Sequence, residues 1–263
     1  MSELKFDAVT VRYGTRRHPI LAVNDVSLTV PEGKVVGLVG ESGSGKSTMA
    51  RAAVGLAPVS EGRILLGGAS IERARRERAV QMVFQDPYSS LDPRMSISDT
   101  LIEAMPRGVR GVAARREAER LLELVQLDGR FAQSYPSEMS GGQRQRVALA
   151  RALAGRPQVI IADEITSALD VSIQGAVLNV VRDLQRELGF SMLFISHNLA
   201  VVRYVASEVA VMYRGRIVEH GATAAVLERP DHDYTRTLLA AIPGGGAASS
   251  SPSAIHETPG SPA

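Results

Sequence analysis

The chain of 263 residues has no cysteine and no tryptophan, and aromatic residues make up only 4% of it. The lack of cysteine excludes disulfide bonds, zinc–thiolate sites, cysteine nucleophiles and cysteine-ligated iron–sulfur clusters. No stretch approaches the roughly 18 consecutive apolar residues of a membrane span, and the first residues are acidic where a secretory signal would be apolar. A formal charge of +2 is too small to indicate nucleic-acid binding. These absences favour a globular, cytoplasmic protein.

What the sequence does contain is an alternation of apolar, strand-like runs with helical patterns. The predicted strands are Leu4–Val11, Asn24–Val30, Lys34–Val39, Arg63–Leu66, Val80–Phe84, Gln158–Ala162, Ser191–Ser196 and Glu208–Met212. A helical pattern separates the later strands, most clearly over Val171–Leu188. Strands that alternate with helices predict an α/β fold, with a largely parallel sheet covered on both faces.

Between residues 86 and 156 the pattern becomes mostly helical. The predicted amphipathic helices are Ser96–Met105, Val112–Val125 and Gly141–Leu153. We expect residues 1–85 and 157–242 to form the main domain and residues 86–156 to be a helical insertion in it. Residues 243–263 are rich in glycine, alanine, serine and proline, which predicts a disordered tail.

A glycine-rich turn follows the Lys34–Val39 strand and reads Gly40-Glu41-Ser42-Gly43-Ser44-Gly45-Lys46-Ser47-Thr48. It fits the pattern GxxxxGK[ST] between a strand and a helix, which is typical of a phosphate-binding loop. Glycines let backbone amides approach phosphate oxygens, and the following helix adds the positive end of its dipole. Lys46 is expected to reach the β- and γ-phosphates, and the Ser47 hydroxyl to bind Mg²⁺. The motif predicts a site for a nucleoside triphosphate.

The predicted strand Gln158–Ala162 is followed by two acidic residues, Asp163 and Glu164. Parallel strands end at one edge of a sheet, so these carboxylates are expected beside the phosphate loop. Asp163 is suited to hold Mg²⁺, and Glu164 is then free to polarise an attacking water.

Further motifs follow in the order typical of one family. They are Tyr13, Gln85 in Val-Phe-Gln-Asp-Pro, Ser140-Gly141-Gly142-Gln143 at the start of a predicted helix, Ser167-Ala-Leu-Asp170, and His197 in Ile-Ser-His-Asn. With the phosphate loop, these residues resemble the ATP-binding cassette (ABC) ATPases. In that family the corresponding elements are an aromatic ring that stacks on adenine, the Q-loop, the signature motif, the D-loop and the switch histidine.

The resemblance implies a RecA-like P-loop NTPase core, an antiparallel β subdomain and an inserted α-helical subdomain. It implies that Glu164, His197 and Gln85 are catalytic, and that Ser47, Gln85 and Asp163 hold Mg²⁺. The ATP-binding residues would be Tyr13, Gly40–Thr48, Ser140, Gly141, Gly142, Gln143 and Asp170. In this family the signature motif contacts ATP bound by another subunit. Because the chain has one phosphate loop and one signature motif, two ATPase chains, identical or related, are expected to pair head-to-tail.

Three further stretches resemble, more narrowly, the ATPase subunits of oligopeptide, dipeptide and nickel importers. They are residues 83–95, 212–221 and 230–239. This implies an ATPase that powers import of peptides or a related solute such as nickel, at the cytoplasmic face of the membrane. The implied partners are transmembrane permease subunits and an extracytoplasmic solute-binding protein, and not nucleic acid.

The chain departs from the subfamily pattern at three positions. Met139 replaces leucine, Asp233 replaces a proline near the C-terminus, and Ile165 replaces the proline after Glu164. The last change removes a restraint on φ and is expected to loosen the D-loop. Two alternatives stay open: a soluble ABC ATPase that acts on nucleic acid or ribosomes, and a hydrolysis-impaired partner cassette. The near-balanced charge argues against the first, and the occupied catalytic positions argue against the second.

Overall fold

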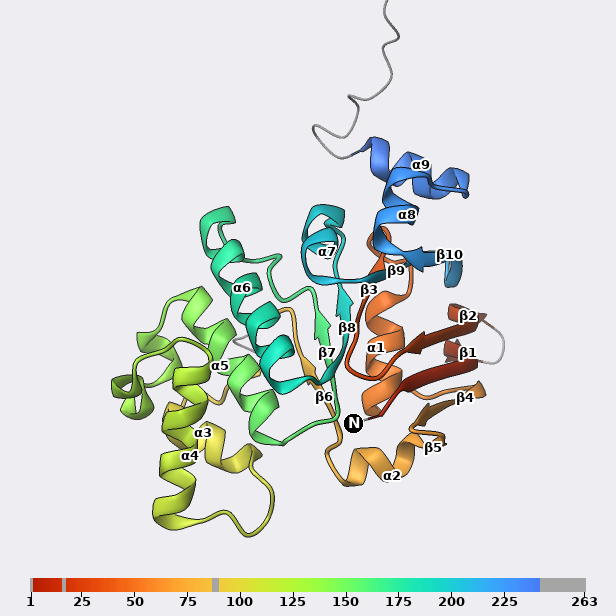
Figure 1. Cartoon of the computed structure of the whole chain (residues 1–263). Coiled ribbons are helices and arrows are strands. Elements are labelled where there is room, and N and C mark those ends of the chain that lie inside the picture. The colour runs from red at the N-terminus through yellow and green to blue at the C-terminus, as the bar shows by residue number, and fades with distance from the viewer. Residues whose placement is uncertain (1, 16–17, 87–89, 242–263) are drawn as a thin grey trace, which may run out of the picture.

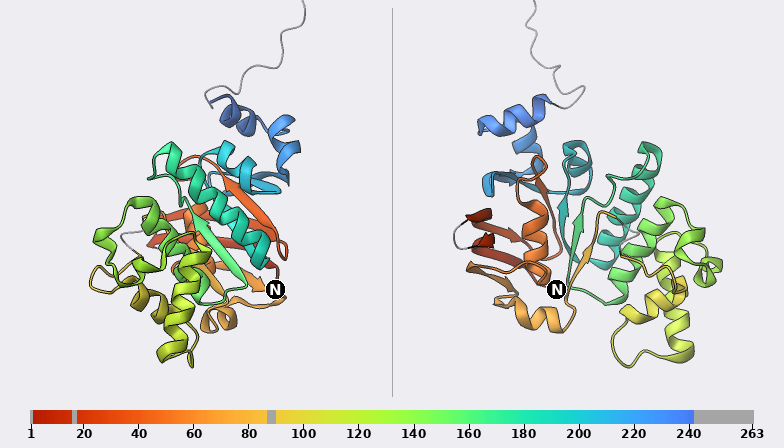
Figure 2. Two further views of the ribbon diagram at one scale, coloured as in Figure 1. Left: turned by 60° about the vertical axis from the view of Figure 1, so that its left-hand side comes forward. Right: turned by 180° about the vertical axis from the view of Figure 1, so that it is seen from behind.

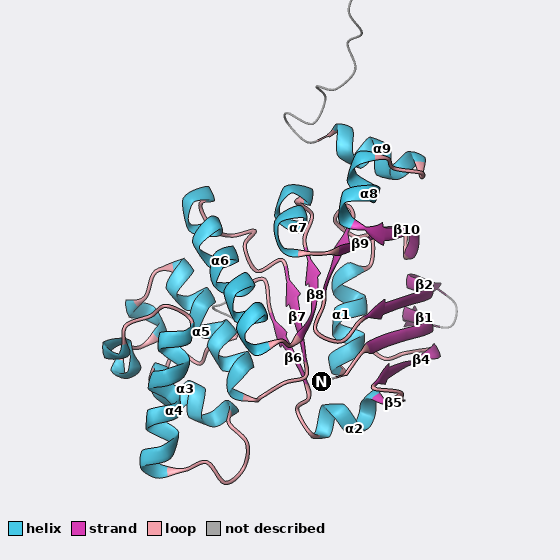
Figure 3. Cartoon of the chain, in the orientation of Figure 1, coloured by secondary structure: helices cyan, strands magenta, loops and turns pink. Residues whose placement is uncertain are grey.

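A six-stranded sheet forms the centre of the computed structural model, which describes residues 2–15, 18–86 and 90–241. Its strands are β3 (Val35–Val39), β6 (Val80–Val83), β7 (Val159–Asp163), β8 (Ser191–Ile195), β9 (Glu208–Tyr213) and β10 (Arg216–Ala222). They lie in the order β10-β9-β3-β8-β7-β6, and only the β9–β10 pair is antiparallel (Figure 3). Because β3, β6, β7 and β8 are parallel, their carboxyl ends share one edge of the sheet.

Alternate residues of the central strands enter two separate hydrophobic cores. On β3, Val36 and Leu38 enter one core, whereas Val35 and Val39 enter the other. The strands β7, β8 and β9 divide their residues in the same way. Such strands are buried on both faces, and therefore read as continuous apolar runs in the sequence.

One core lies between the six-stranded sheet and a second, antiparallel sheet. The second sheet has the order β2-β1-β4-β5. Its strands are β1 (Leu4–Thr15), β2 (His18–Val30), β4 (Glu61–Leu66) and β5 (Ala69–Ser70). Helix α1 (Lys46–Val54) lies between the two sheets, and α2 (Ile71–Arg76) follows β5 (Figure 1). Helix α1 ends at Gly55, whose φ of 84° is typical of a left-handed glycine cap.

Helices cover the opposite face of the six-stranded sheet and enclose the other core (Figures 1 and 2). The helices of the predicted insertion are α3 (Ile97–Ala104), α4 (Gly111–Leu124) and α5 (Gly141–Ala154), with short 3₁₀ helices at Gly129–Gln133 and Pro136–Glu138. They are followed along the chain by α6 (Val171–Leu188), α7 (Leu199–Val205), α8 (Thr223–Glu228) and α9 (Asp233–Ala240). Seen from behind, the inserted helices and the antiparallel sheet lie on opposite sides of the molecule (Figure 2).

The fold class predicted from the sequence is confirmed: a parallel core sheet, an antiparallel sheet and inserted helices are all present. Helix α6 has the predicted bounds, and most predicted strands differ by one or two residues. The strand β2 starts at His18, six residues before the predicted start. The domain boundaries at residues 86 and 156 stay predictions, and the predicted tail lies outside the described residues. Within the described part of the chain, no helix is both long and apolar enough to span a membrane.

Helix α4 allows a test of the core beneath the inserted helices. Leu122 is fully buried, whereas Val112 on the same helix is 68% exposed. We expect Leu122→Ala to lower the free energy of unfolding by about 2–5 kcal/mol, because it leaves a cavity. Val112→Ala should change it by less than about 0.5 kcal/mol. Urea denaturation followed by circular dichroism measures both, and equal stability of the two variants would contradict this packing.

Candidate functional site

The loop after β3 is in close contact with the backbone of two other segments. Gly40 has φ 151°, and a Cβ atom there would lie 2.1 Å from the Met212 carbonyl oxygen. Gly45 has φ 110°, and its Cβ would lie 2.3 Å from the Ala22 carbonyl oxygen. Since real Cβ atoms do not approach backbone this closely, glycine is needed at both positions for steric and conformational reasons.

Lys46, the first residue of α1, is buried beneath this loop, with 4% of its surface exposed. Its Nζ donates hydrogen bonds to the carbonyl oxygens of Gly40 and Glu41, both at 2.8 Å, and lies 3.4 Å from the Ser44 Oγ. Burial lowers the pKa of Lys46, and the nearby carboxylates of Glu164 and Asp163 oppose that shift. All three ammonium hydrogens thus have a hydrogen-bond partner in the loop, and the contact with the Ser44 Oγ is the longest of the three.

Ser47 and Asp163 bring two oxygen atoms together at the carboxyl edge of the sheet. The Ser47 Oγ donates to the Asp163 Oδ1 at 3.0 Å, and Asp163 is 5% exposed at the end of β7. Burial raises the pKa of Asp163, while the Ser47 hydroxyl opposes that shift. Thr48 follows in α1 and is half-buried. A buried carboxylate beside a hydroxyl is an oxygen donor set that suits Mg²⁺.

Glu164 has a backbone conformation that is uncommon for a residue with a side chain. Its φ is 48°, and its amide donates to the Ile195 carbonyl oxygen at 3.0 Å. Its Oε2 lies 3.2 Å from the Nδ1 of His197, whose side chain is 57% exposed, against 16% for Glu164. Left-handed residues other than glycine are costly and are concentrated at functional sites. This conformation places the carboxylate at the sheet edge, next to the predicted switch histidine.

Gln85 reaches the same region through Ser167. Its Nε2 donates to the Ser167 Oγ at 3.1 Å, and that hydroxyl donates to the Glu164 carbonyl oxygen at 2.9 Å. The structure therefore gives Gln85 a contact with the loop after Glu164, whereas the sequence predicted it as a metal ligand. Ser167 was noted in the sequence only as part of the D-loop motif, and no role was predicted for it.

Ile165, the substitution expected to loosen the D-loop, has a buried side chain. It is 2% exposed and belongs to the core beneath the inserted helices. The amide of Ser167 donates to the Glu164 carbonyl oxygen at 3.1 Å, and the side chain of Gln174 donates to the Leu169 carbonyl oxygen at 2.8 Å. The segment is thus held by side-chain burial and by hydrogen bonds at both of its ends.

The signature residues form the start of α5. The Ser140 Oγ accepts from the Gln143 amide at 3.3 Å, and the Gln143 Oε1 accepts from the Ser140 amide at 2.8 Å, which is a capping box. A Cβ on Gly142 would lie 2.5 Å from the Ile173 Cγ2, so the helix start packs closely on α6. Asp170 is the residue that precedes α6. A cavity of about 360 Å³ lies here, bordered by α5, α6 and the segment from Gln126 to Phe131 that follows α4.

Tyr13 lies toward the outer end of the β1–β2 hairpin. It pairs with Ile20 and is 37% exposed. In the same hairpin it is Ala22, rather than Tyr13, whose carbonyl meets the phosphate loop at Gly45. The structure thus brings Gly40–Thr48 together with Asp163 and Glu164, and joins His197 and, through Ser167, Gln85 to Glu164. The signature residues lie at the start of α5. The adenine contact of Tyr13 stays a prediction.

Two contacts of the phosphate loop were not predicted from the sequence. The Glu41 amide donates to the Tyr234 Oη at 2.9 Å, and the Gly215 amide donates to the Ser44 carbonyl oxygen at 2.8 Å. Tyr234 belongs to α9, and Gly215 lies in the turn between β9 and β10. No local pattern relates residues 41 and 234, so the sequence held no signal for this pair.

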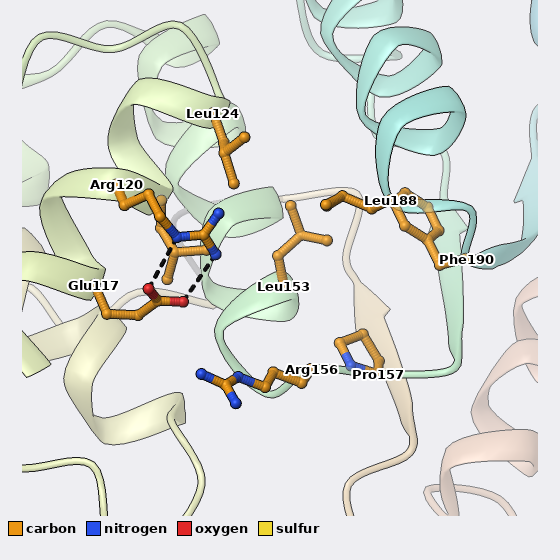
Figure 4. A pocket seen from close by; sticks show the side chains of 9 residues that line it. Glu117, Arg120, Leu124, Leu153, Arg156, Pro157, Leu188 and Phe190 are labelled. Carbon is orange, nitrogen blue, oxygen red and sulfur yellow. Dashed lines mark hydrogen bonds and ion pairs between the residues drawn. The ribbon is translucent and has the colours of Figure 1, made fainter. Parts of the chain in front are cut away.

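A larger cavity lies at the opposite edge of the sheet (Figure 4). Its volume is about 480 Å³, and its lining includes Arg156 and Pro157 before β7, and Leu188 and Phe190 before β8. Glu117 and Arg120 of α4 form an ion pair of 2.9 Å at its rim. Because these residues lie at the amino ends of β7 and β8, this cavity is separate from the phosphate loop.

Comparisons with known proteins agree with this geometry. The family model described as ABC transporter matches residues 23–167. A protein of Brucella ovis named as a peptide import ATP-binding protein is 46% identical over 241 residues, which cover 88% of this chain and 75% of the relative. A protein of Brucella abortus with the same description is 48% identical over 233 residues, which cover 84% of this chain and 69% of the relative.

Solved structures show the same fold. A dimeric ATP-binding cassette in a post-hydrolysis state, bound to ADP and phosphate, matches with a TM-score of 0.73 and 29% identity, over 84% of this chain and 98% of that one. The protein cbiO1 of Clostridium perfringens, part of an ABC transporter complex, matches with a TM-score of 0.76 and 26% identity, over 86% and 90% of the two chains. On these matches and the site geometry, the chain belongs to the ABC transporter family.

Proposed function

We propose that this chain binds and hydrolyses ATP and that it powers an importer of peptides. The observation that carries the proposal is the cluster at the sheet edge, where Lys46, the Ser47–Asp163 pair and Glu164 meet at the ends of β3 and β7. Relatives at 46–48% identity are named for peptide import and ATP binding. These names favour import over action on nucleic acid or ribosomes.

The phosphate loop binds the triphosphate through its amides and through Lys46. The amides of residues 43–48 surround the start of α1, where the helix dipole is positive. Lys46 holds the loop through its two hydrogen bonds of 2.8 Å, and its longer contact with the Ser44 Oγ is the one it would exchange for the β- and γ-phosphates. Because Lys46 is buried, its attraction to phosphate is screened less than that of a surface lysine.

Ser47 and Asp163 are the residues that would hold Mg²⁺, with Gln85 joining them once the nucleotide is bound. Bound magnesium supplies positive charge to the phosphate oxygens, and so stabilises the charge that develops on transfer. In the structure the two oxygens are already 3.0 Å apart. Gln85 would have to exchange its contact with Ser167 for one with the metal site.

Glu164 acts as the base that orients water and accepts its proton. Its left-handed backbone directs the carboxylate out of the sheet edge, and His197 lies 3.2 Å from it. His197 orients the carboxylate and is placed to reach the γ-phosphate, which keeps the attacking water in line.

A second ATPase chain completes the site. Ser140 caps α5, and Gly141 and Gly142 begin it, so their amides are at a helix start suited to phosphate. In a head-to-tail pair they would contact ATP on the partner, with Asp170 at the same interface. The similar cassette bound to ADP and phosphate is itself a dimer.

The remaining partners would be transmembrane permease subunits and an extracytoplasmic solute-binding protein, which places this chain at the cytoplasmic face of the membrane. ATP stabilises the closed dimer and ADP the open one, so each cycle shifts the permease between two access states.

Glu164→Gln separates binding from hydrolysis. The amide keeps the shape of the carboxylate but cannot accept a proton, so turnover should fall by at least about 100-fold while ATP still binds. The variant should then elute as a dimer with ATP in size-exclusion chromatography. Glu187→Gln, at an exposed position of α6, is the control and should turn over like the unmodified chain. A monomeric Glu164→Gln protein that still hydrolyses ATP would show that this assignment is wrong.

Lys46→Ala tests the phosphate loop itself. Loss of the ammonium should weaken ATP binding by at least about 100-fold, because it removes charged hydrogen bonds to phosphate. Lys34→Ala is the matched control, because Lys34 is exposed and precedes β3, whereas the phosphate loop follows its carboxyl end. Titration calorimetry with ATP measures both variants. Equal affinities would exclude Lys46 from the nucleotide site.

A further inference from the structure

The C-terminal part of the chain contacts the phosphate loop at Glu41 as well as at Ser44. The Tyr234 hydroxyl accepts the Glu41 amide at 2.9 Å. Tyr234 is the second residue of α9 and is 8% exposed, although Glu41 itself lies at the surface. These residues are 193 positions apart in the sequence. A helix at the far end of the chain therefore touches the loop that begins after β3.

The peptide groups on either side of Glu41 take part in several interactions at once. The carbonyl oxygen of Glu41 accepts from the Lys46 Nζ at 2.8 Å and from the Ser44 amide at 3.2 Å. The peptide group between Gly40 and Glu41 is held at both of its polar atoms. Its N–H donates to the Tyr234 Oη, and its carbonyl oxygen accepts from the Lys46 Nζ. The orientation of these peptides thus fixes where the ammonium of Lys46 lies.

The side chain of Tyr234 is itself well anchored. Its ring stacks on Tyr213 of β9, with centroids 4.1 Å apart and planes 29° apart. Burial raises the pKa of Tyr234, so the phenol is neutral near pH 7 and its oxygen accepts a hydrogen bond. A stacked, buried ring has few conformations to lose, which makes it a firm support for the loop.

The start of α9 is fixed to the central sheet by Glu219 of β10. The two carboxylate oxygens of Glu219 accept from the amides of Asp231 and His232 at 2.9 and 3.1 Å. The His232 Nδ1 then accepts the Tyr234 amide at 3.1 Å and caps the helix. Asp233, which stands where the subfamily has proline, is the first residue of α9, a position that suits either residue type.

We propose that Tyr234 is a positioning residue for ATP binding, which holds the Glu41 peptide so that Lys46 and the loop amides are set before the nucleotide arrives. The proposal rests on the function proposed above. Without the hydroxyl the loop has more conformations in the free state, and ATP must order it on binding. The loss should appear in affinity, and so in KM, more than in kcat, because Tyr234 contacts the loop at Glu41, whereas Glu164 and His197 follow β7 and β8.

Tyr234→Phe removes one oxygen and keeps the ring stack. Tyr213→Phe is the matched control, because it removes the hydroxyl of the other ring in the same stack. In the full-length chain without nucleotide, hydrogen exchange of the Glu41 amide, followed by NMR, should become several-fold faster in Tyr234→Phe only. ATP affinity measured by calorimetry should become roughly three- to tenfold weaker in Tyr234→Phe and stay unchanged in Tyr213→Phe. Thermal unfolding temperatures of the two variants should be similar.

Each outcome decides the proposal. Unchanged exchange at Glu41 in Tyr234→Phe means that the hydrogen bond is not formed in solution, and overturns it. Faster exchange with unchanged ATP affinity means that the contact does not position the loop, and also overturns it. Equal losses of affinity in both variants mean that the effect is not specific to the Tyr234 hydroxyl, and overturn the proposal as well. Because exchange is measured without nucleotide, it reports on the contact even if the unmodified chain does not hydrolyse ATP.

Discussion

The burial of Lys46 is the constraint on which the rest of the site depends. An ammonium group with 4% exposure needs oxygen partners, since an isolated buried charge is very costly. The loop supplies two carbonyl oxygens at 2.8 Å, and the end of β7 supplies carboxylates nearby. This also explains the glycine at position 40. Gly40 brings its carbonyl to Lys46 while lying against the backbone of β9, where a side chain would not fit. One buried cation thus explains why a glycine-rich loop and an acidic strand end occur together.

The two sheets give the loop a fixed frame. It leaves the central strand β3, contacts β2 at Ala22 and β9 at Met212, and enters α1 between the sheets. The C-terminal elements add contacts from outside, at Glu41 and Ser44. Residues of β2, β9, the turn after β9 and α9 therefore converge on four loop positions, Gly40, Glu41, Ser44 and Gly45. This arrangement explains why residues 41–43 of the loop are exposed, whereas Gly40, Ser44 and Lys46 are buried.

Much of the fold and the site could be predicted because their signals are local. The phosphate loop and the acidic strand end have fixed spacings, and buried parallel strands read as apolar runs. The strand β10 was not predicted because its residues are half-buried or exposed and lack clear alternation. Helix α7 has seven residues, too few for a helical period to stand out. The bonds of Gln85 to Ser167 and of Glu41 to Tyr234 join residues 82 and 193 positions apart, a relation that no single-sequence pattern encodes.

The division of each central strand between two cores has a mechanical consequence. A strand whose alternate residues are embedded in two close-packed interiors cannot slide along its axis without disturbing both. The strand β3 is therefore a fixed reference for everything attached to it. Movement of the inserted helices relative to the antiparallel sheet must occur by repacking on the surfaces of the six-stranded sheet, while the strands themselves keep their register.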